Sequence, residues 1–267
     1  MTIPSKASVA RLKSAAARGN AEAAAALADL YRLGTGVSQS WADAFRWYLA
    51  GAVLGDQDAQ NNVGTCYLEG LGHERDVQEA IGWYKKSAEQ GNVDAQWNLA
   101  KRFLHGDGVP VDYQAALRWY SAAAEQGNME ALCELGTMYR FGRGVERNLV
   151  AAADMHVAAA LEGDSVAMGN LSDYHEELEA IALAGNQIAS LCLAKMYDRG
   201  LGVEKEQATM FAWLLWANKD CTRDPDTGYA EEVDERYDFY RSALPREIIA
   251  RGKDQYRALK KRRAKGQ

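Results

Sequence analysis

Small and apolar residues recur along this chain at the spacing of a helix that buries one face. Ala95, Leu99, Ala100 and Phe103 fall at i, i+4, i+5 and i+8, which places them on a single helical stripe. A second stripe follows a polar link and begins with the Trp-Tyr pair at Trp119, followed by paired alanines. The pattern therefore predicts a helical hairpin, in which two helices pack their apolar stripes against each other.

A Tyr/Phe-x-x-Gly-x-Gly signature ends the first stripe of each hairpin. Its copies begin at Tyr31, Tyr67, Phe103, Tyr139 and Tyr197, and the first four are 36 residues apart. A left-handed C-terminal cap costs Gly nothing and other residues about 1 kcal/mol or more, so these glycines are predicted to end the first helix. Asp76, Asp112 and Asn148, four positions after the second Gly, are predicted to cap the second helix. A fixed period of this length predicts one hairpin copied and stacked into an all-α solenoid.

Two departures from the period fall next to each other. The fourth and fifth glycine pairs are 58 residues apart, so residues 165–186 are predicted to be a truncated unit that has lost its Gly-x-Gly turn and part of a helix. The unit before it carries Met155 and His156 where the other units have an aromatic pair. We expect these two irregularities to pack on each other and to interrupt the superhelix locally.

The two recurrent patterns, Leu-Ala/Gly-x-x-Tyr-x-x-Gly-x-Gly-Val and Trp-Tyr-x-x-Ala-Ala-x-x-Gly, resemble the Sel1-like repeat, a relative of the tetratricopeptide repeat. The resemblance covers about residues 5–221 and implies an α/α right-handed superhelical solenoid whose first helices line a concave face. It also implies an adaptor, regulatory or host-interaction protein rather than an enzyme. The predicted organisation is a capping half-repeat (1–20), a repeat array (21–221) that includes the truncated unit (165–186) and one further unit (187–221), and a helical C-terminal cap with a basic tail (222–267).

Tetratricopeptide geometry, transferred onto these units, places five positions of each first helix on the concave face. The resulting candidate partner-binding residues are Asn61, Thr65, Glu69, Trp97, Lys101, His105, Thr137, Arg140, Phe141 and Lys195. An aromatic side chain beside Arg and Lys is typical of binding hot spots. The expected partner is a protein or peptide, and Trp97→Ala and Arg140→Ala are expected to weaken its binding while leaving thermal stability nearly unchanged.

The sequence contains no motif that predicts catalysis. The glycine pairs lack the preceding strand and third Gly of a nucleotide fingerprint. The four cysteines have no metal-ligand spacing, and His175, Glu176 and Glu177 point in different directions on a helix. We therefore expect no cofactor, no metal and no small-molecule substrate, although an active site assembled from distant units would leave no such motif.

Charge is distributed unevenly along the chain. The formal charge is −6, but residues 251–267 carry +7, which leaves −13 on the preceding body. The basic residues of this tail are Arg251, Lys253, Arg257, Lys260, Lys261, Arg262, Arg263 and Lys265. These residues allow two interpretations. The tail pairs with the acidic body or is simply solvated, or, as the alternative function, it binds nucleic acid or an anionic surface in a salt-dependent way. No apolar run is long enough for a membrane span or a secretion signal, so a cytoplasmic location is expected. A toxin-neutralising immunity role is consistent with the resemblance.

Overall fold

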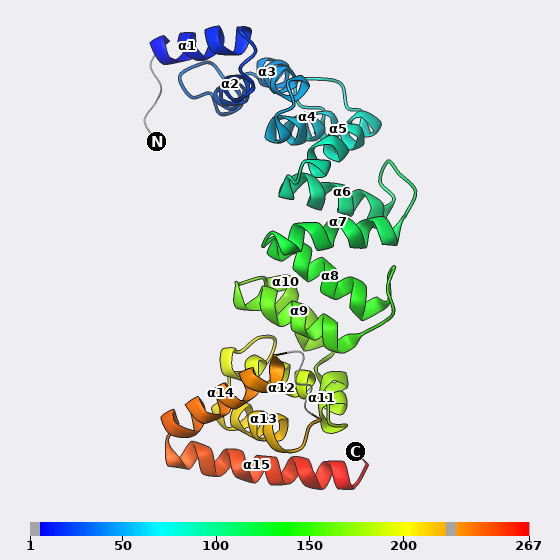
Figure 1. The fold of residues 1–267 in the computed structure, drawn as a ribbon, viewed down its shortest axis with the longest axis vertical. Helices are drawn as coiled ribbons and strands as arrows, with labels where there is room; N and C mark the ends of the chain where they lie inside the picture. The colour runs from blue at the N-terminus through cyan, green and yellow to red at the C-terminus, as the bar shows by residue number, and fades with distance from the viewer. Residues whose placement is uncertain (1–5, 223–227, 267) are drawn as a thin grey trace. The chain divides into compact units, whose positions relative to one another are not determined.

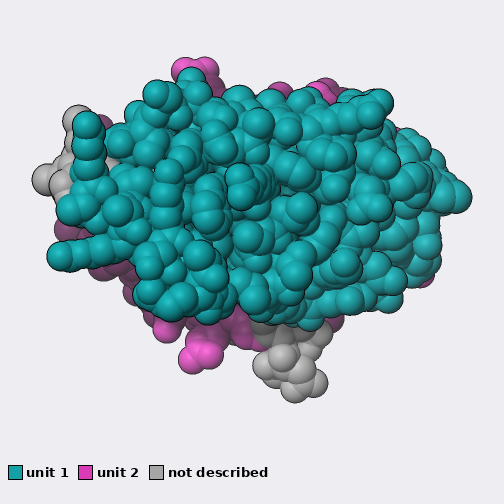
Figure 2. All heavy atoms as spheres, turned by 90° about the horizontal axis from the view of Figure 1, so that it is seen from above, with its two compact units in different colours: residues 1–128 teal, residues 129–267 magenta. Residues whose placement is uncertain are grey.

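A computed structural model describes residues 6–222 and 228–266 of this chain (Figure 1). The chain divides into two compact units, residues 1–128 and residues 129–267 (Figure 2). The first unit contains α1 (Lys6–Ala17), α2 (Ala21–Leu33), α3 (Trp41–Val53), α4 (Gln57–Glu69), α5 (Val77–Glu89), α6 (Val93–His105) and α7 (Tyr113–Glu125). The second contains α8 (Met129–Phe141), α9 (Leu149–Leu161), α10 (Ser165–Asp173), α11 (His175–Leu183), α12 (Gln187–Arg199), α13 (Gln207–Lys219), α14 (Tyr229–Ala243) and α15 (Arg246–Ala264). Over the described residues the secondary structure is helical apart from one isolated bridge, so the all-α prediction is confirmed.

The ends of the helices follow the predicted capping residues. Gly34, Gly70, Gly106 and Gly200 adopt left-handed conformations, and each donates its backbone N–H to a carbonyl of the helix that it ends. The side chains of Asp76, Asp112 and Asn148 accept backbone N–H groups in the first turns of α5, α7 and α9. The 36-residue period therefore reflects two capping devices repeated in phase.

In the hairpins of the first unit, a small residue of the first helix lies opposite a tyrosine of the second. A Cβ added to Gly64 on α4 would lie 2.8 Å from the Tyr84 ring on α5. Ala28 and Ala100 stand at the equivalent positions and are fully buried. The ring-bearing residues Tyr48, Tyr84 and Tyr120 are each 1% exposed. Close approach of the two helices therefore depends on the absence of a larger side chain at the small position.

The tryptophans beside these tyrosines are less buried than their phase predicts. Trp213 in α13 is buried, whereas Trp83 and Trp119 are only partly buried at the margin of the core. Lys86 lies 4.0 Å from the centroid of the Trp83 ring, and Arg118 lies 5.1 Å from that of Trp119. A basic neighbour thus covers the outer face of each ring, as a cation–π pair does.

Buried glutamines of the first unit bridge the two helices of their own repeat and also bond to the preceding repeat. Gln60 Oε1 accepts a hydrogen bond from Gln90 Nε2 at 2.7 Å, and Gln96 Oε1 accepts one from Gln126 Nε2 at 2.9 Å. Gln60 and Gln96 also donate to the carbonyls of Ala52 and Ala88. Because buried amides need partners, this arrangement recurs in consecutive repeats, and its bonds to Ala52 and Ala88 tie each repeat to the one before it.

The second unit contains the predicted truncation and the C-terminal helices. Residues 165–186 form two nine-residue helices, α10 and α11, with the single residue Tyr174 between them. Helix α15 begins after Pro245 and packs on α13. The predicted N-terminal cap (1–20) includes residues 1–5, and the predicted C-terminal cap (222–267) includes residues 223–227 and 267, all of which lie outside the described residues. The predicted boundaries of the array therefore stay predictions.

We predict that Gly72→Ala destabilises the first unit by at least about 2 kcal/mol, because φ is +73° and a Cβ would lie 2.1 Å from the Trp41 carbonyl oxygen. Gly82→Ala is the matched control. Gly82 lies exposed within α5 with no atom in reach of an added Cβ, so Ala should stabilise that helix by about 0.5–1 kcal/mol. Thermal melts followed by circular dichroism measure both changes, and an unaltered melt for Gly72→Ala would contradict the close approach.

Candidate functional site

The candidate residues of α4 are tied to the repeat core by hydrogen bonds. Thr65 Oγ1 lies 3.1 Å from Tyr84 Oη and donates to the Asn61 carbonyl at 3.2 Å. Asn61 Oδ1 accepts a hydrogen bond from Asn98 Nδ2 of α6, also at 3.2 Å. Glu69, at the end of α4, is exposed. The buried tyrosine of this hairpin, Tyr84, thus positions the polar side chain of Thr65 at the surface of the first helix.

Helix α6 brings together an aromatic side chain and a cation from the predicted set. Lys101 Nζ lies 4.9 Å from the centroid of the Trp97 ring, one turn away on the same helix. Both residues are half-buried, and the buried Trp97 Nε1 has no hydrogen-bond acceptor among the described residues. His105 is exposed in the last turn of α6. Trp97 and Lys101 therefore form a compact, partly exposed pair, with His105 at the C-terminal end of the same helix.

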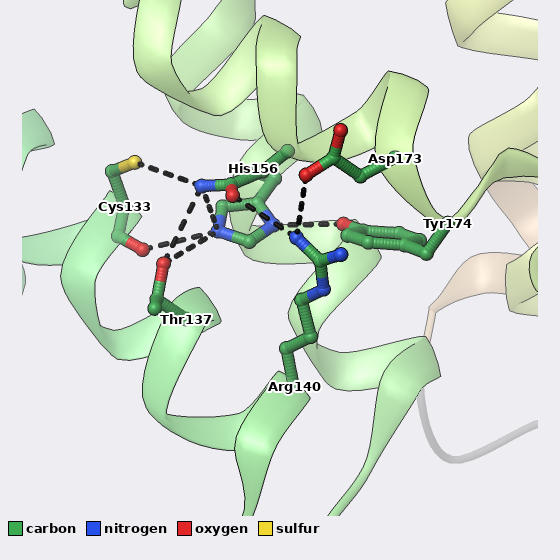
Figure 3. Close-up of polar contacts among 7 residues, drawn as sticks. Cys133, Thr137, Arg140, His156, Asp173 and Tyr174 are labelled. Atoms are coloured by element: carbon green, nitrogen blue, oxygen red, sulfur yellow. Dashed lines mark hydrogen bonds and ion pairs between the residues drawn. The ribbon is translucent and has the colours of Figure 1, made fainter.

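In the second unit, the candidate residues of α8 lie over a buried polar network centred on His156 (Figure 3). His156 Nδ1 lies 2.7 Å from Tyr174 Oη, and His156 Nε2 lies 3.1 Å from the Cys133 carbonyl oxygen. Thr137 Oγ1 lies 3.4 Å from Nε2. These contacts confirm that the histidine of the fourth repeat packs on the truncated unit, and Tyr174 is the residue that meets it.

The carbonyl of Cys133 fixes the tautomer of His156. A carbonyl oxygen only accepts, so Nε2 carries the proton and donates to it, while Nδ1 accepts from the Tyr174 hydroxyl. Burial lowers the pKa of His156 from 6.5 to about 4, and the nearby charge of Arg140 acts in the same direction. The imidazole is therefore neutral at pH 7 and serves as a structural hydrogen-bond bridge between α8, α9 and the start of α11.

Arg140 takes part in this junction and is not free for a partner. Its Nη1 lies 3.2 Å from Asp173 Oδ2 and 3.2 Å from Asn170 Oδ1, and its guanidinium lies 4.9 Å from the centroid of the Tyr174 ring. Its side chain is 16% exposed. This geometry corrects the expectation that Arg140→Ala leaves stability nearly unchanged. Phe141, in contrast, is 55% exposed.

Lys195 lies under a helix of its own chain. Its Nζ lies 3.0 Å from Glu232 of α14, and Tyr240 of α14 donates to Asp198 at 2.7 Å. Burial by itself would raise the pKa of Glu232, but Lys195 and Arg236 lower it overall. The repeat period does not predict that α14 covers α12. The acidic first turn of α14, which faces a lysine among the candidate residues, was the feature of the sequence that could have indicated this packing.

Half of the basic tail is engaged within the second unit. Arg251 pairs with Glu206, Lys260 with Asp220 and Arg262 with Glu179. Arg263 donates to the Asp220 carbonyl. The tail is helical, and these contacts favour the interpretation that it pairs with the acidic body.

Neither a metal-binding cluster nor a membrane span emerges from the part of the chain that the structure describes. No three His, Cys, Asp or Glu side chains in it are grouped as metal ligands would be. No helix in it combines the length and apolarity needed to cross a membrane.

Comparison with known proteins gives one family and several related folds. A family profile described as Sel1 repeat matches residues 21–56, 57–92, 93–128, 130–164 and 190–214. A protective antigen of uropathogenic Escherichia coli with an SLR fold is 27% identical over 95% of this chain and 56% of its own, with a TM-score of 0.59. A Sel1 repeat protein from Oxalobacter formigenes is 25% identical over 86% of this chain and 92% of its own, with a TM-score of 0.58.

A more distant structure is an immunity protein from Pseudomonas aeruginosa. It is 20% identical over 86% of this chain and 72% of its own, with a TM-score of 0.40. This likeness is too remote to support an inference about role. A search of curated proteins gave no match. The chain spans only about half of the antigen's length, 56%, so the activity of that whole protein is not transferred.

We predict that stability falls as the pH drops from 6.5 to 4. The unfolded chain binds a proton at His156 near pH 6.5, whereas the folded chain does so only near pH 4, so the loss reaches up to about 3 kcal/mol. Urea unfolding at several pH values, compared with His156→Leu, isolates this contribution. The difference between the two proteins should shrink toward pH 4, and a constant difference would contradict the burial of a neutral imidazole.

We also predict that Arg140→Ala destabilises the second unit by about 1–2 kcal/mol, because it removes an ion pair, an amide contact and a stacked ring. Arg143→Ala is the control, since Arg143 is exposed and lies over the Phe141 ring at 5.4 Å. Urea unfolding at pH 7 measures both variants. Equal stability of the two would show that the contacts of Arg140 contribute nothing.

Proposed function

Because the chain belongs to the Sel1-repeat family, we propose that it is a non-catalytic scaffold that holds a protein partner on the first helices of its repeats. Sel1 repeats generally mediate interactions between proteins. In the first unit the proposed surface consists of Asn61, Thr65, Glu69, Trp97, Lys101 and His105. In the second unit, Thr137 and Phe141 occupy equivalent positions of their own repeat and are proposed separately. Lys195 and Arg140 are left out because both are engaged within the chain.

The observation that carries the proposal is the seating of α14 on α12. A first helix of the array holds another helix there through a lysine on the predicted row, Lys195, which pairs with Glu232. Lys101 occupies the equivalent position of its own repeat, six residues after the conserved Ala95. Within residues 6–128, α5 and α7 make the most extensive contacts with α6, and α4 reaches it through the Asn61–Asn98 hydrogen bond. Lys101 and Trp97 therefore offer a partner the same kind of contact.

This comparison also indicates the chemistry of the partner. Helix α14 contributes a carboxylate and a tyrosine hydroxyl to α12 and buries Val233 in the same core. A partner segment with acidic and aromatic side chains would complement Lys101 and Trp97 in the same way. The folded array needs no ordering on binding, which reduces the entropic cost of association. A regulatory or toxin-neutralising role and a cytoplasmic location stay predictions.

We predict that Lys101→Glu weakens binding of the partner at least about tenfold, because it replaces an attractive charge contact by a repulsive one. Lys85→Glu is the matched control. Lys85 is 65% exposed on α5, a second helix, and makes only a 3.9 Å contact with Glu89.

Affinity purification from cells that express each variant, followed by mass spectrometry and calorimetry with the purified partner, measures the effect. Trp97→Ala should weaken binding in the same assay, with circular dichroism confirming that it stays folded. Equal partner recovery by wild type, Lys101→Glu and Trp97→Ala would refute a binding surface on the first helices. Equal loss with Lys85→Glu would refute its restriction to them.

A further inference from the structure

A cavity of about 390 Å³ lies between α13, α14 and α15 in the second unit. Its apolar lining comes from Phe211 and Leu215 of α13, Tyr237 of α14 and Tyr256 of α15. Phe211 and Leu215 are buried, and the Phe211 and Tyr237 rings are stacked with their centroids 5.8 Å apart. Cavities that bind small molecules have about this size and this apolar, aromatic lining.

The other residues that line the cavity are all basic. Lys219 comes from α13, Arg241 from α14, and Lys253 and Arg257 from α15, and none of the lining residues is acidic. Arg257 pairs with Asp254 on its own helix at 2.6 Å, so this cation is partly neutralised. Lys219, Arg241 and Lys253 are exposed. Three helices thus bring four cations around one apolar cavity in a body whose overall charge is negative.

The walls of this cavity are held by contacts of their own. Gly252 lets α15 approach α13 closely, since an added Cβ would lie 2.9 Å from the Ala208 carbonyl oxygen and 3.0 Å from the Phe211 ring. Tyr256 donates its hydroxyl to Asp220 at 2.6 Å. Lys260 pairs with the same carboxylate at 3.2 Å. The tyrosine is thereby fixed at its polar tip, and the cavity is present before any ligand arrives.

We propose that this cavity binds a small organic anion, in which an aromatic or aliphatic body carries a phosphate, sulfonate or carboxylate group. The body would lie against the stacked rings and Leu215, and the anionic group would reach Arg241 and Lys253. An inorganic anion would leave the apolar lining unused. This site is separate from the residues of the proposed partner-binding surface, and it gives Lys253 of the basic tail a local role.

The test uses 8-anilinonaphthalene-1-sulfonate, a fluorescent aromatic sulfonate, as the probe on the full chain. Its dissociation constant is compared between wild type and the double variant Arg241→Ala/Lys253→Ala. The double variant should raise the dissociation constant about tenfold or more, as expected when two charge contacts are lost. The matched control is Lys261→Ala/Lys265→Ala, which removes two exposed cations of the same tail that do not line the cavity and should stay within about twofold.

Thermal melts confirm that both double variants are folded. Absence of probe binding, an unchanged dissociation constant in the double variant, or an equal change in both double variants would overturn the proposal. Competition then separates the sources of the anion. Displacement of the probe by adenosine monophosphate or by decanoate, at concentrations where inorganic phosphate does not compete, supports an organic anion of the corresponding kind. Equal displacement by inorganic phosphate would overturn the role of the apolar lining.

Discussion

The packing of the repeats depends on one recurrent contact, between a small residue of the first helix and a ring of the following helix, as at Gly64–Tyr84 and Gly136–His156. At Gly64 the space for even a methyl group is taken by Tyr84. The same ring carries a hydroxyl that reaches Thr65 on the surface row. In the first repeat, Tyr48 donates to Asp29 at 2.6 Å in the same way. The core contact that joins two helices therefore also fixes the polar residues that the array presents to a partner.

The fourth repeat shows what happens when the ring is exchanged. A Cβ added to Gly136 would lie 2.7 Å from the His156 imidazole, so the small position is kept although the tyrosine is not. An imidazole has two nitrogen atoms that need partners when it is buried. The Cys133 carbonyl accepts a hydrogen bond from one nitrogen. The hydroxyl of Tyr174, the single residue between α10 and α11, donates to the other. The substitution in one repeat and the truncation of the next thus form one structural feature.

The sequence was sufficient to predict the features that repeat. The glycine caps, Asp76, Asp112 and Asn148 each follow from local chemistry that recurs at a constant spacing, so every copy supports the others. The placement of Lys195 and Arg140 was not predictable in this way. Each contacts a segment that occurs once, α14 or the truncated unit, and no period indicates where a unique segment will pack. The glutamine contacts were not predictable for a different reason. Gln60 and Gln96 are polar positions on a stripe, and their burial depends on an amide at the end of the same repeat and on a carbonyl of the preceding repeat.

Charge and apolar packing make different contributions to the attachment of the basic tail at the end of the array. Exposed ion pairs contribute only about 0–1 kcal/mol each, so Arg251–Glu206 and Arg262–Glu179 are too weak to hold a helix in place by themselves. Burial of Leu259 and the close approach of Gly252 to Phe211 supply the main attachment of α15. The ion pairs then select the register in which that attachment forms. This register turns Lys253 toward the cavity beside Phe211 and leaves Lys261 in solvent, so cations of one helix acquire different surroundings.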